Sequence, residues 1–322
     1  MGGSSSFPMI SIPRNRVFVV TGGNSGIGYE TSKWIAMMGG HVIIACRSEI
    51  RAKEAIEKMR TDFAEEKSKG TKGVITEGEI IVEFMQLDLA SLSSVMAFIE
   101  AFKASGKKLH VLLCNAGLVH ELEFTEDENE LMFQVNYLSH LLITIKLFPI
   151  IQNSGEDLRI VNNSSLAHGY TNFNMDNIQG KKESFHAWDY YSKSKGYQIL
   201  QMYTMNRKLQ RKGVSINCIN PGIVESPFHR AHPRGWMSCA ISCSSGCGCT
   251  NAQSEGGAAL IDAAVNPKYE GRGDLYISEL KVKSTKAYTR KRENQEALWK
   301  YSMEKLSKYL TEEDMAIFDH EK

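Results

Sequence analysis

Strand-like and helix-like patterns of apolar residues alternate along most of this 322-residue chain. The strand-like patterns are short runs rich in β-branched and aromatic side chains, as expected of strands buried on both faces of a sheet. They are predicted at Arg16–Val20, His41–Cys46, Ile80–Leu87, Leu109–Leu113, Arg159–Asn163 and Val214–Ile219.

The segments between these runs have the composition or the apolar spacing of helices. Helices are predicted over Tyr29–Met38, Ile50–Lys67, Ser91–Phe102, Glu128–Pro149, a segment that contains Tyr191 and continues to about Arg211, and Ala252–Ala264. Regular alternation of strand and helix is typical of an α/β fold, in which right-handed crossovers build a parallel sheet. We therefore predict a doubly wound parallel sheet of about seven strands, a Rossmann fold, in a single domain.

Composition divides the chain around that domain. Residues 1–13 are predicted to be a flexible leader, and residues 14–280 the nucleotide-binding and catalytic domain. Residues 281–322 are predicted to form a helical extension that packs on the same domain. Within the domain, residues 227–251 interrupt the alternation with an irregular segment.

Charge and hydropathy exclude several classes of protein. The formal net charge is +1, so no overall positive field favours nucleic acid as a partner. No secretory signal peptide is recognisable. The longest apolar run, Leu141–Ile151, is too short to span a membrane and is interrupted by Lys146 and Pro149. A cytoplasmic protein is expected.

The first residues match an N-myristoylation pattern at Gly2. A single myristoyl chain would attach the protein to a membrane only weakly and reversibly. A flexible leader without a lipid is the alternative. The expected location is therefore the cytoplasm, with peripheral membrane association as a variant of it.

The seven cysteines follow neither a disulfide framework nor a zinc pattern. Cys46, Cys114 and Cys218 lie in predicted strands, as expected of buried free thiols in a reducing compartment. The other four are Cys239, Cys243, Cys247 and Cys249. Their spacing, C-x3-C-x3-C-x-C, differs from the C-x2-C or C-x4-C pairs of structural zinc sites. We predict no metal site, and reactive or acylated thiols are an alternative to incidental cysteines.

A glycine-rich turn, Thr21-Gly-Gly-Asn-Ser-Gly-Ile-Gly28, joins the first predicted strand to the first helix. Glycines let the backbone turn tightly and approach a pyrophosphate, while the helix N-terminus supplies unpaired amides and a partial positive charge. We therefore predict dinucleotide binding by Gly22, Asn24, Ser25, Gly26, Ile27 and Gly28.

Residues at the ends of the next strands bear on the choice of dinucleotide. Arg47 stands near the place where NAD-preferring Rossmann folds carry an acid, and its cation could pair with the 2′-phosphate of NADP. Glu49 lies close by, so NAD remains as the less favoured cofactor. Asp88 could meet the adenine ring or cap the following helix. The small residues of Asn115-Ala116-Gly117 would let backbone pass close to a flat cofactor.

Tyr191 and Lys195 are four residues apart in a predicted helix and therefore face the same side. An ammonium about 4 Å from the phenol would favour the phenolate by roughly 4 kcal/mol at an effective dielectric constant of about 20. That would lower the tyrosine pKa from about 10 towards neutrality, where a general acid or base works best. Alone, the pair also fits a solvated helix face, so its interpretation depends on the rest of the chain.

Two further polar positions stand out in the second half. Asn136 falls inside a predicted helix, where asparagine is unfavourable unless its amide is used or points to water. Ser164 and Ser165 follow the fifth predicted strand, at the edge where open α/β sheets bind ligands. Pro221-Gly222 follows the sixth strand at the same edge.

The motifs occur in one order, namely the glycine turn, Asn115-Ala116-Gly117, Asn136, Ser165, Tyr191-x-x-x-Lys195 and Pro221-Gly222. In this order and spacing the chain resembles the short-chain dehydrogenase/reductase family from about Arg14 to Leu306. Finer features resemble its retinol-dehydrogenase-like and WW-domain-oxidoreductase-like branch. They are Ala45-Cys46-Arg47, Leu87-Asp88-Leu89-Ala90-Ser91, Ser164-Ser165-Leu166-Ala167-His168 and Leu298-Trp299 with Ser302. Cys114 departs from the family, which more often has a second asparagine there.

The resemblance implies an NADP-dependent oxidoreductase that acts on an apolar alcohol, aldehyde or ketone of retinoid, steroid or lipid type. Tyr191 would be the general acid or base, and Lys195 would lower its pKa and hold the nicotinamide ribose. Ser165 would bind the substrate oxygen, and Asn136 would hold a water that links Lys195 to solvent. The segment 227–251 would close over the substrate. The carboxamide would be fixed by Pro221, Gly222, Val224 and Ser226.

Two other functions compete with this interpretation. A catalytically weak NADP-binding regulatory protein needs only the glycine turn, so the complete set of Asn136, Ser165, Tyr191 and Lys195 argues against it. An S-adenosylmethionine methyltransferase would explain the glycines but not the tyrosine and lysine. His168 could line the substrate pocket or be a structural histidine. The physiological substrate, the reaction direction and the oligomeric state, including a homo-oligomer, stay open.

Overall fold

The structure, a computed structural model, describes residues 7–182, 184–209, 213–222 and 253–318. The predictions made for Gly2, Val224 and Ser226 therefore lie outside the described residues. The same holds for the segment 227–251 and for its cysteines, which are Cys239, Cys243, Cys247 and Cys249.

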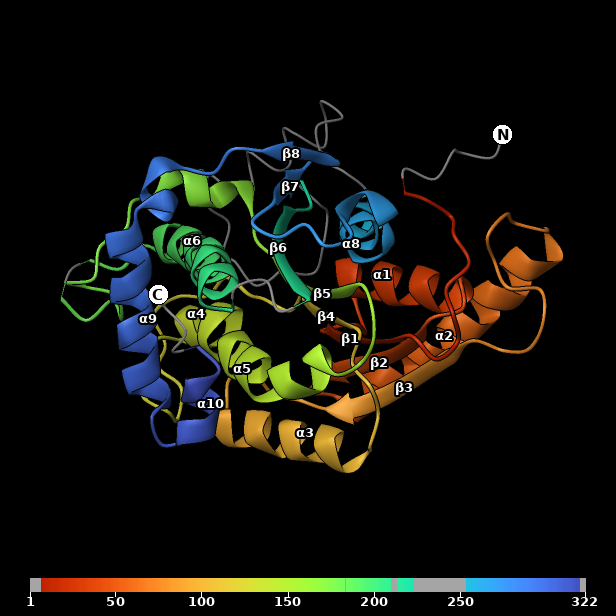
Figure 1. The fold of residues 1–322 in the computed structure, drawn as a ribbon, viewed down its shortest axis with the longest axis horizontal. Coiled ribbons are helices and arrows are strands. Elements are labelled where there is room, and N and C mark those ends of the chain that lie inside the picture. The colour runs from red at the N-terminus through yellow and green to blue at the C-terminus, as the bar shows by residue number, and fades with distance from the viewer. Residues whose placement is uncertain (1–6, 183, 210–212, 223–252, 319–322) are drawn as a thin grey trace.

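Eight strands form one sheet in the order β3-β2-β1-β4-β5-β6-β7-β8 (Figure 1). The strands are β1 (Val17–Thr21), β2 (His41–Cys46), β3 (Ile81–Gln86), β4 (Val111–Cys114), β5 (Leu158–Asn163), β6 (Val214–Asn220), β7 (Tyr276–Ser278) and β8 (Lys281–Lys283). All pairs from β3 to β7 are parallel, which confirms the predicted doubly wound sheet. The strand order reverses between β1 and β4, and such a switch point is where these folds bind ligands.

The eighth strand was not predicted. β8 pairs antiparallel with β7 across a tight turn whose central residues, Glu279 and Leu280, both have positive φ. Hairpin turns of this kind usually carry Asn-Gly or a similar pair, so this turn lacks the sequence signal that would have indicated it. Because β8 has only three residues, all exposed, it has no apolar pattern either.

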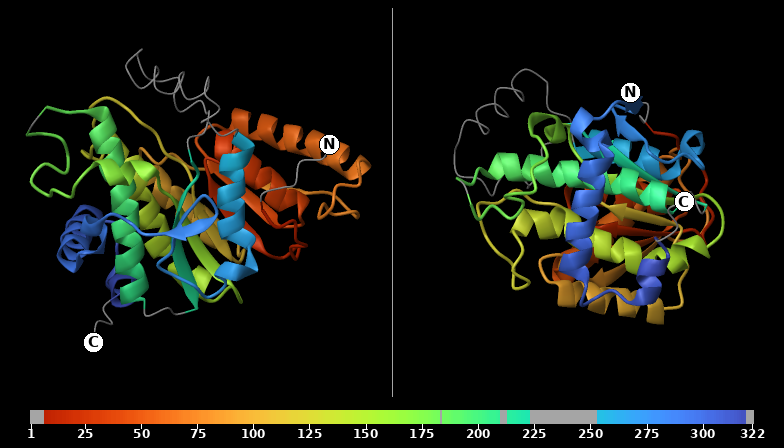
Figure 2. Two further views of the ribbon diagram at one scale, coloured as in Figure 1. Left: turned by 90° about the horizontal axis from the view of Figure 1, so that it is seen from above. Right: turned by 60° about the vertical axis from the view of Figure 1, so that its left-hand side comes forward.

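Helices cover both faces of the sheet. One face carries α1 (Gly26–Met37), α2 (Glu49–Ser68) and α8 (Gln253–Val265). The other carries α3 (Leu92–Ala104), α4 (Leu131–Phe133), α5 (Ser139–Gln152) and α6 (Ala187–Lys208). Outside α6 lies α9 (Arg292–Leu306), followed by α10 (Glu312–Ala316) (Figure 2, left). Short 3-10 turns are η2 (Leu166–Tyr170), η4 (Pro267–Tyr269) and η5 (Ala287–Arg290).

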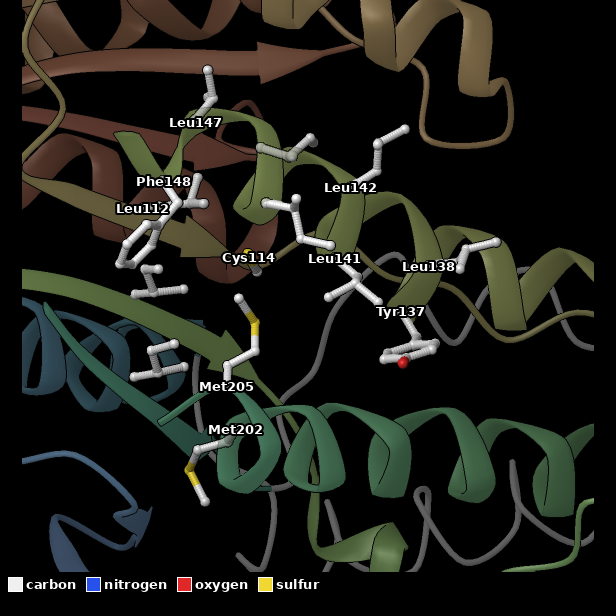
Figure 3. Packing of buried hydrophobic residues seen from close by; sticks show 14 of the residues in the cluster. Leu112, Cys114, Tyr137, Leu138, Leu141, Leu142, Leu147, Phe148, Met202 and Met205 are labelled. Carbon is white, nitrogen blue, oxygen red and sulfur yellow. The ribbon is translucent and has the colours of Figure 1, made fainter. Parts of the chain in front are cut away.

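The core explains why the strands are apolar on both sides. Along β1, Val17 and Val19 pack with α3 and α5, while Phe18 and Val20 pack with α1 and α8. Figure 3 shows side chains of α5 and α6, among them Leu141 and Met205, around the strand residues Leu112 and Cys114.

The predicted helix Glu128–Pro149 begins three residues late and is interrupted. Glu128 has a positive φ of 59° and cannot belong to it. Glu130 instead caps α4 by accepting hydrogen bonds from two backbone amides. A π-helical turn, η1 (Gln134–Leu138), then separates α4 from α5. The helical stretch Leu131–Gln152 has the length and composition of a membrane span, but its most apolar 18-residue window is entirely buried within the protein, so it serves as a core helix.

The three strand cysteines, Cys46, Cys114 and Cys218, are buried and unbridged, as predicted. Burial raises the pKa of the Cys114 thiol to about 12, so this thiol is protonated and acts as a small apolar core residue.

Candidate active site

The glycine turn lies at the switch point of the sheet. Gly22 and Gly26 have φ values of 65° and 56°, which only glycine adopts without strain. A methyl group added at Gly28 would overlap the Gly22 carbonyl oxygen. The N-cap of α1, Ser25, makes no side-chain capping bond, and the first turn holds no acidic residue. The turn therefore has the shape and charge that suit a phosphate group.

The end of β4 packs directly on this turn. The Thr21 hydroxyl accepts hydrogen bonds from the backbone amides of Asn115 and Ala116, each at 2.9 Å. The Asn115 side chain donates to the Thr21 carbonyl at 2.8 Å. Two groups of predicted cofactor-binding residues, from β1 and from β4, are thus held together by one threonine.

Arg47 and Asp88 lie at the ends of the neighbouring strands. The Arg47 side chain is exposed, and within the described chain it forms no ion pair. Glu49, the acidic residue for which NAD was retained as the less favoured cofactor, forms an ion pair with Lys53 at 2.7 Å. The Asp88 carboxylate accepts from the Ala90 amide at 2.9 Å, so it closes the turn before α3, while Ser91 caps the helix.

The four predicted catalytic residues converge beside α6, near the end of β5 and the Asn115-Ala116-Gly117 turn that follows β4. The Tyr191 phenol is hydrogen-bonded to the Ser165 hydroxyl. The Lys195 ammonium donates to the Asn163 carbonyl at 2.8 Å and lies 5.6 Å from the centre of the Tyr191 ring. Tyr191 and Lys195 are buried, whereas Ser165 is half-buried.

The neighbouring serine and tyrosine have other partners. The Ser164 hydroxyl donates to the Lys195 backbone carbonyl at 2.8 Å. The Tyr190 hydroxyl donates to the Asn177 carbonyl at 3.0 Å, and its ring stacks on Phe185. Of each adjacent pair, the structure therefore brings Ser165 and Tyr191 together and directs Ser164 and Tyr190 elsewhere.

The Asn136 amide bonds to protein groups on two sides of the site. Its oxygen accepts from the Leu118 amide at 2.8 Å, and its nitrogen donates to the Leu118 carbonyl and to the Ser194 hydroxyl, both at 2.9 Å. Both side-chain donors are therefore used. A methyl group at Gly117 would lie 3.1 Å from the Asn136 oxygen and 3.3 Å from the Lys195 nitrogen. A larger residue there would displace one or both of these groups by a few tenths of an ångström.

The prediction that Lys195 lowers the pKa of Tyr191 is wrong for this arrangement. Burial raises the pKa of Tyr191 to about 12, and the hydrogen bond from Ser165 opposes that shift. Burial also lowers the pKa of Lys195 to about 7. A lysine that is partly deprotonated near neutrality is a weak partner for a phenolate, and the sequence reasoning omitted this cost of burial.

His168 is a structural histidine. It is buried, its Nδ1 lies 2.7 Å from the Ser165 carbonyl, and its Nε2 accepts from the Lys286 amide at 3.4 Å. Burial lowers its pKa. It holds the turn that presents Ser165 against the C-terminal part of the chain.

Sequence reasoning assigned no role to Asn220. Its side-chain oxygen accepts from the amides of Leu166 and Gly222, at 3.1 and 3.3 Å. Its nitrogen donates to the Ser278 hydroxyl at 3.0 Å. Asn220 therefore joins the serine turn to the Pro221-Gly222 turn, in which Gly222 has a φ of 83°. An asparagine at a strand end before Pro-Gly was the sequence feature that could have indicated this role.

Within the described part of the chain, no group of three His, Cys, Asp or Glu side chains is placed to hold a metal ion.

Residues 16–235 match the protein family described as short chain dehydrogenase. The human polyprenol dehydrogenase is 34% identical over 297 residues, which cover 90% of this chain and 84% of that protein. The human WW domain-containing oxidoreductase is 34% identical over 272 residues, or 82% of this chain, and the match spans only 61% of that longer protein. Among solved structures, L-sorbose reductase from Gluconobacter frateurii, complexed with NADPH and L-sorbose, has the same fold. It superposes with a TM-score of 0.63 at 17% identity, over 86% of this chain and all of the other.

Proposed function

Because the chain belongs to the short-chain dehydrogenase family, we propose that it is an NADP-dependent oxidoreductase of apolar carbonyl compounds or alcohols. The observation that carries this proposal is the convergence of Tyr191, Ser165, Lys195 and Asn136 beside the glycine turn. A protein that only sensed the cofactor would not need the hydrogen-bonded Ser165 and Tyr191 pair.

The residues of the turn fit a dinucleotide. The backbone from Gly22 to Gly28, with the free N-terminus of α1, would hold the pyrophosphate. Arg47 would pair with the 2′-phosphate that distinguishes NADP, since Glu49 is held by Lys53. When bound, the nicotinamide supplies or accepts the hydride. The NADPH in L-sorbose reductase supports the same choice by analogy of fold.

Tyr191 would exchange a proton with the substrate oxygen, and Ser165 would donate a hydrogen bond to that oxygen as negative charge develops on it. A tyrosine with a pKa of about 12 is protonated at neutral pH and can give its proton to a carbonyl oxygen. Lys195 has a pKa of about 7 and can accept or release a proton behind the tyrosine. Asn136 would position Leu118 and α6 around this site.

Apolar side chains support an apolar substrate. Val119, Met132, Ala167, Tyr190 and Tyr191 form one buried cluster, against which Trp188 packs. The Trp188 and Tyr191 ring centres are 5.3 Å apart. The name of human polyprenol dehydrogenase gives an apolar alcohol as its substrate, and this supports the same class. Acylation at Gly2 and assembly into a homo-oligomer stay predictions.

Replacement of Tyr191 tests the proposal. Tyr191→Phe should reduce turnover of retinal, steroid ketones or short aldehydes by at least about a hundredfold, since general acid catalysis is lost. Binding of NADPH, followed by its fluorescence, should stay unchanged. The matched control is Tyr190→Phe, because that hydroxyl bonds a loop carbonyl away from Ser165. Full activity in Tyr191→Phe, or faster reduction with NADH than with NADPH by the parent enzyme, would contradict the respective part of the proposal.

A further inference from the structure

His140 is a fully buried histidine between the two halves of the proposed site. It lies in the first turn of α5, four residues after Asn136, and is only 1% exposed. Its Nε2 lies 2.9 Å from the Thr21 hydroxyl, at the glycine turn. Its Nδ1 lies 3.4 Å from the Asn136 backbone carbonyl, in the π-helical turn η1. One imidazole ring thus connects the cofactor side of the site to the catalytic side.

The hydrogen bonds of Thr21 determine which ring nitrogen carries the proton. A threonine hydroxyl has one proton to donate and two lone pairs to accept with. Both lone pairs are used by the amides of Asn115 and Ala116. The Thr21 hydroxyl therefore donates its proton in the contact with His140. Two acceptors are within reach of that proton, and the His140 Nε2 at 2.9 Å is nearer than the Leu113 carbonyl at 3.3 Å. Nε2 accepts, and Nδ1 carries the proton and donates to the Asn136 carbonyl.

The ring is neutral under ordinary conditions, since burial lowers the pKa of His140 to about 3. A neutral imidazole has one donor and one acceptor, and the two partners require that combination. The Asn136 carbonyl also accepts from the Gln198 side chain on α6 at 2.8 Å. Two side chains therefore bond to the Asn136 carbonyl. They are His140, which also contacts Thr21 on β1, and Gln198 on α6.

From these contacts we infer that His140 is a positioning residue that couples the cofactor-binding turn to Asn136 and the catalytic helix α6. It does so through a fixed Nδ1–H tautomer, and its role rests on the proposed function. Loss of the Thr21 contact loosens the Thr21, Asn115 and Ala116 turn and weakens cofactor binding. Loss of the Asn136 contact releases the catalytic side and slows turnover.

Two substitutions separate the contacts. Asparagine places its amide near the Nδ1 position, so His140→Asn keeps the Asn136 contact and loses that to Thr21. Glutamine reaches the Nε2 position, so His140→Gln does the reverse. We expect the NADPH Kd to rise about five- to tenfold in His140→Asn, with kcat within about twofold, and the opposite pattern in His140→Gln. Ser139→Ala is the control, because it removes a buried hydroxyl from the same helix whose hydrogen bond goes to the Leu89 carbonyl and not to Thr21, Asn136 or His140.

The outcomes distinguish this inference from the proposed function. If both His140 variants are destabilised like Ser139→Ala but keep the parent Kd and kcat, the role is structural and the inference is overturned. A parent protein that does not bind NADPH overturns the proposed function and this inference with it. If the variants fail to fold, nitrogen NMR of the parent with labelled histidine decides. An Nδ1–H tautomer that does not titrate near neutral pH supports the inference, and an Nε2–H or titrating ring overturns it.

Discussion

The Lys195 ammonium donates a hydrogen bond to the backbone carbonyl of Asn163 at 2.8 Å. This contact joins α6 to the last residue of β5 and holds the amine beside Gly117, 5.6 Å from the centre of the Tyr191 ring. Because the lysine is buried with a neutral partner, the folded protein disfavours its charged form. The contact thus explains both where the amine lies and why its pKa falls to about 7.

The pH dependence of stability follows from that pKa. Lys195 has a pKa of about 7 in the folded protein, against the ordinary lysine value of 10.5 in an unfolded chain. Between these values the unfolded chain binds more protons, so the free energy of unfolding should rise with pH. Denaturant titrations at several pH values from about 7 to 7.5 would measure the rise, because closer to the ordinary cysteine pKa of about 8.5 the buried thiols, such as Cys114 with its pKa of about 12, oppose it. Lys195→Met should flatten the curve, and an unchanged slope in that variant would exclude Lys195 as the cause.

Gly117 should be sensitive to the smallest side chain. In Gly117→Ala the new methyl group would lie 3.1 Å from the Asn136 oxygen and 3.3 Å from the Lys195 nitrogen, so both must move by a few tenths of an ångström. We expect kcat to fall about tenfold, since catalytic groups tolerate little displacement. Gly169→Ala is the matched control, because its methyl group meets no atom within 4 Å. Steady-state kinetics of both variants would show whether the effect is specific to position 117.

Charge reversal at Arg47 should change cofactor preference. In Arg47→Glu the 2′-phosphate of NADPH would face a carboxylate, so we expect the NADPH Kd to rise by about ten- to a hundredfold. NADH binding should improve or stay the same. Fluorescence titration with both nucleotides measures the ratio, with Arg60→Gln on the exposed face of α2 as the control. An equal loss for NADPH and NADH would indicate a general effect on binding.

The ion pair between Lys146 and Asp314 should stabilise the C-terminal helix. The two side chains are 2.8 Å apart and are 7% and 12% exposed, so α10 is tied to the core helix α5. Asp314→Asn should reduce the free energy of unfolding by about 1–3 kcal/mol, since a buried ammonium loses its partner. Burial opposes ionisation of Asp314, but its bonds to Lys146 and Thr311 prevail and keep its pKa below 3.8. Its contribution is therefore present above pH 3.8 and is lost as the pH falls further.

Urea denaturation at neutral pH would measure the effect of Asp314→Asn. Glu312→Gln, an exposed change in the same helix, serves as its control. A loss of stability that is equal in the two variants would show that the charge of α10, and not its pairing with Lys146, matters.

Local sequence patterns were enough to predict much of the fold. The first six strands, all parallel, were predicted within one or two residues of their ends, because strands buried on both faces are apolar without interruption. The short parallel strand β7 was not placed. The glycine turn was also recognisable, since positive φ and close approach leave little choice of residue at Gly22 and Gly26. By contrast, β8 is short, exposed and entered through a turn without glycine, so no local preference marks it.

By itself, the sequence determined the order of the elements, the family and the set of residues from which the site is built. These depend on spacing along the chain, and Tyr191 and Lys195 face one side of α6 in any helix. Only the tertiary structure decided what surrounds them. Burial raises the pKa of Tyr191, whereas the sequence predicted that it would be lowered. The Asn136 amide bonds to Leu118 and Ser194. The contact of His140 with Thr21 joins residues 119 positions apart, and no spacing along the chain reveals such a pair. Desolvation and long-range hydrogen bonds arise only when distant segments pack together.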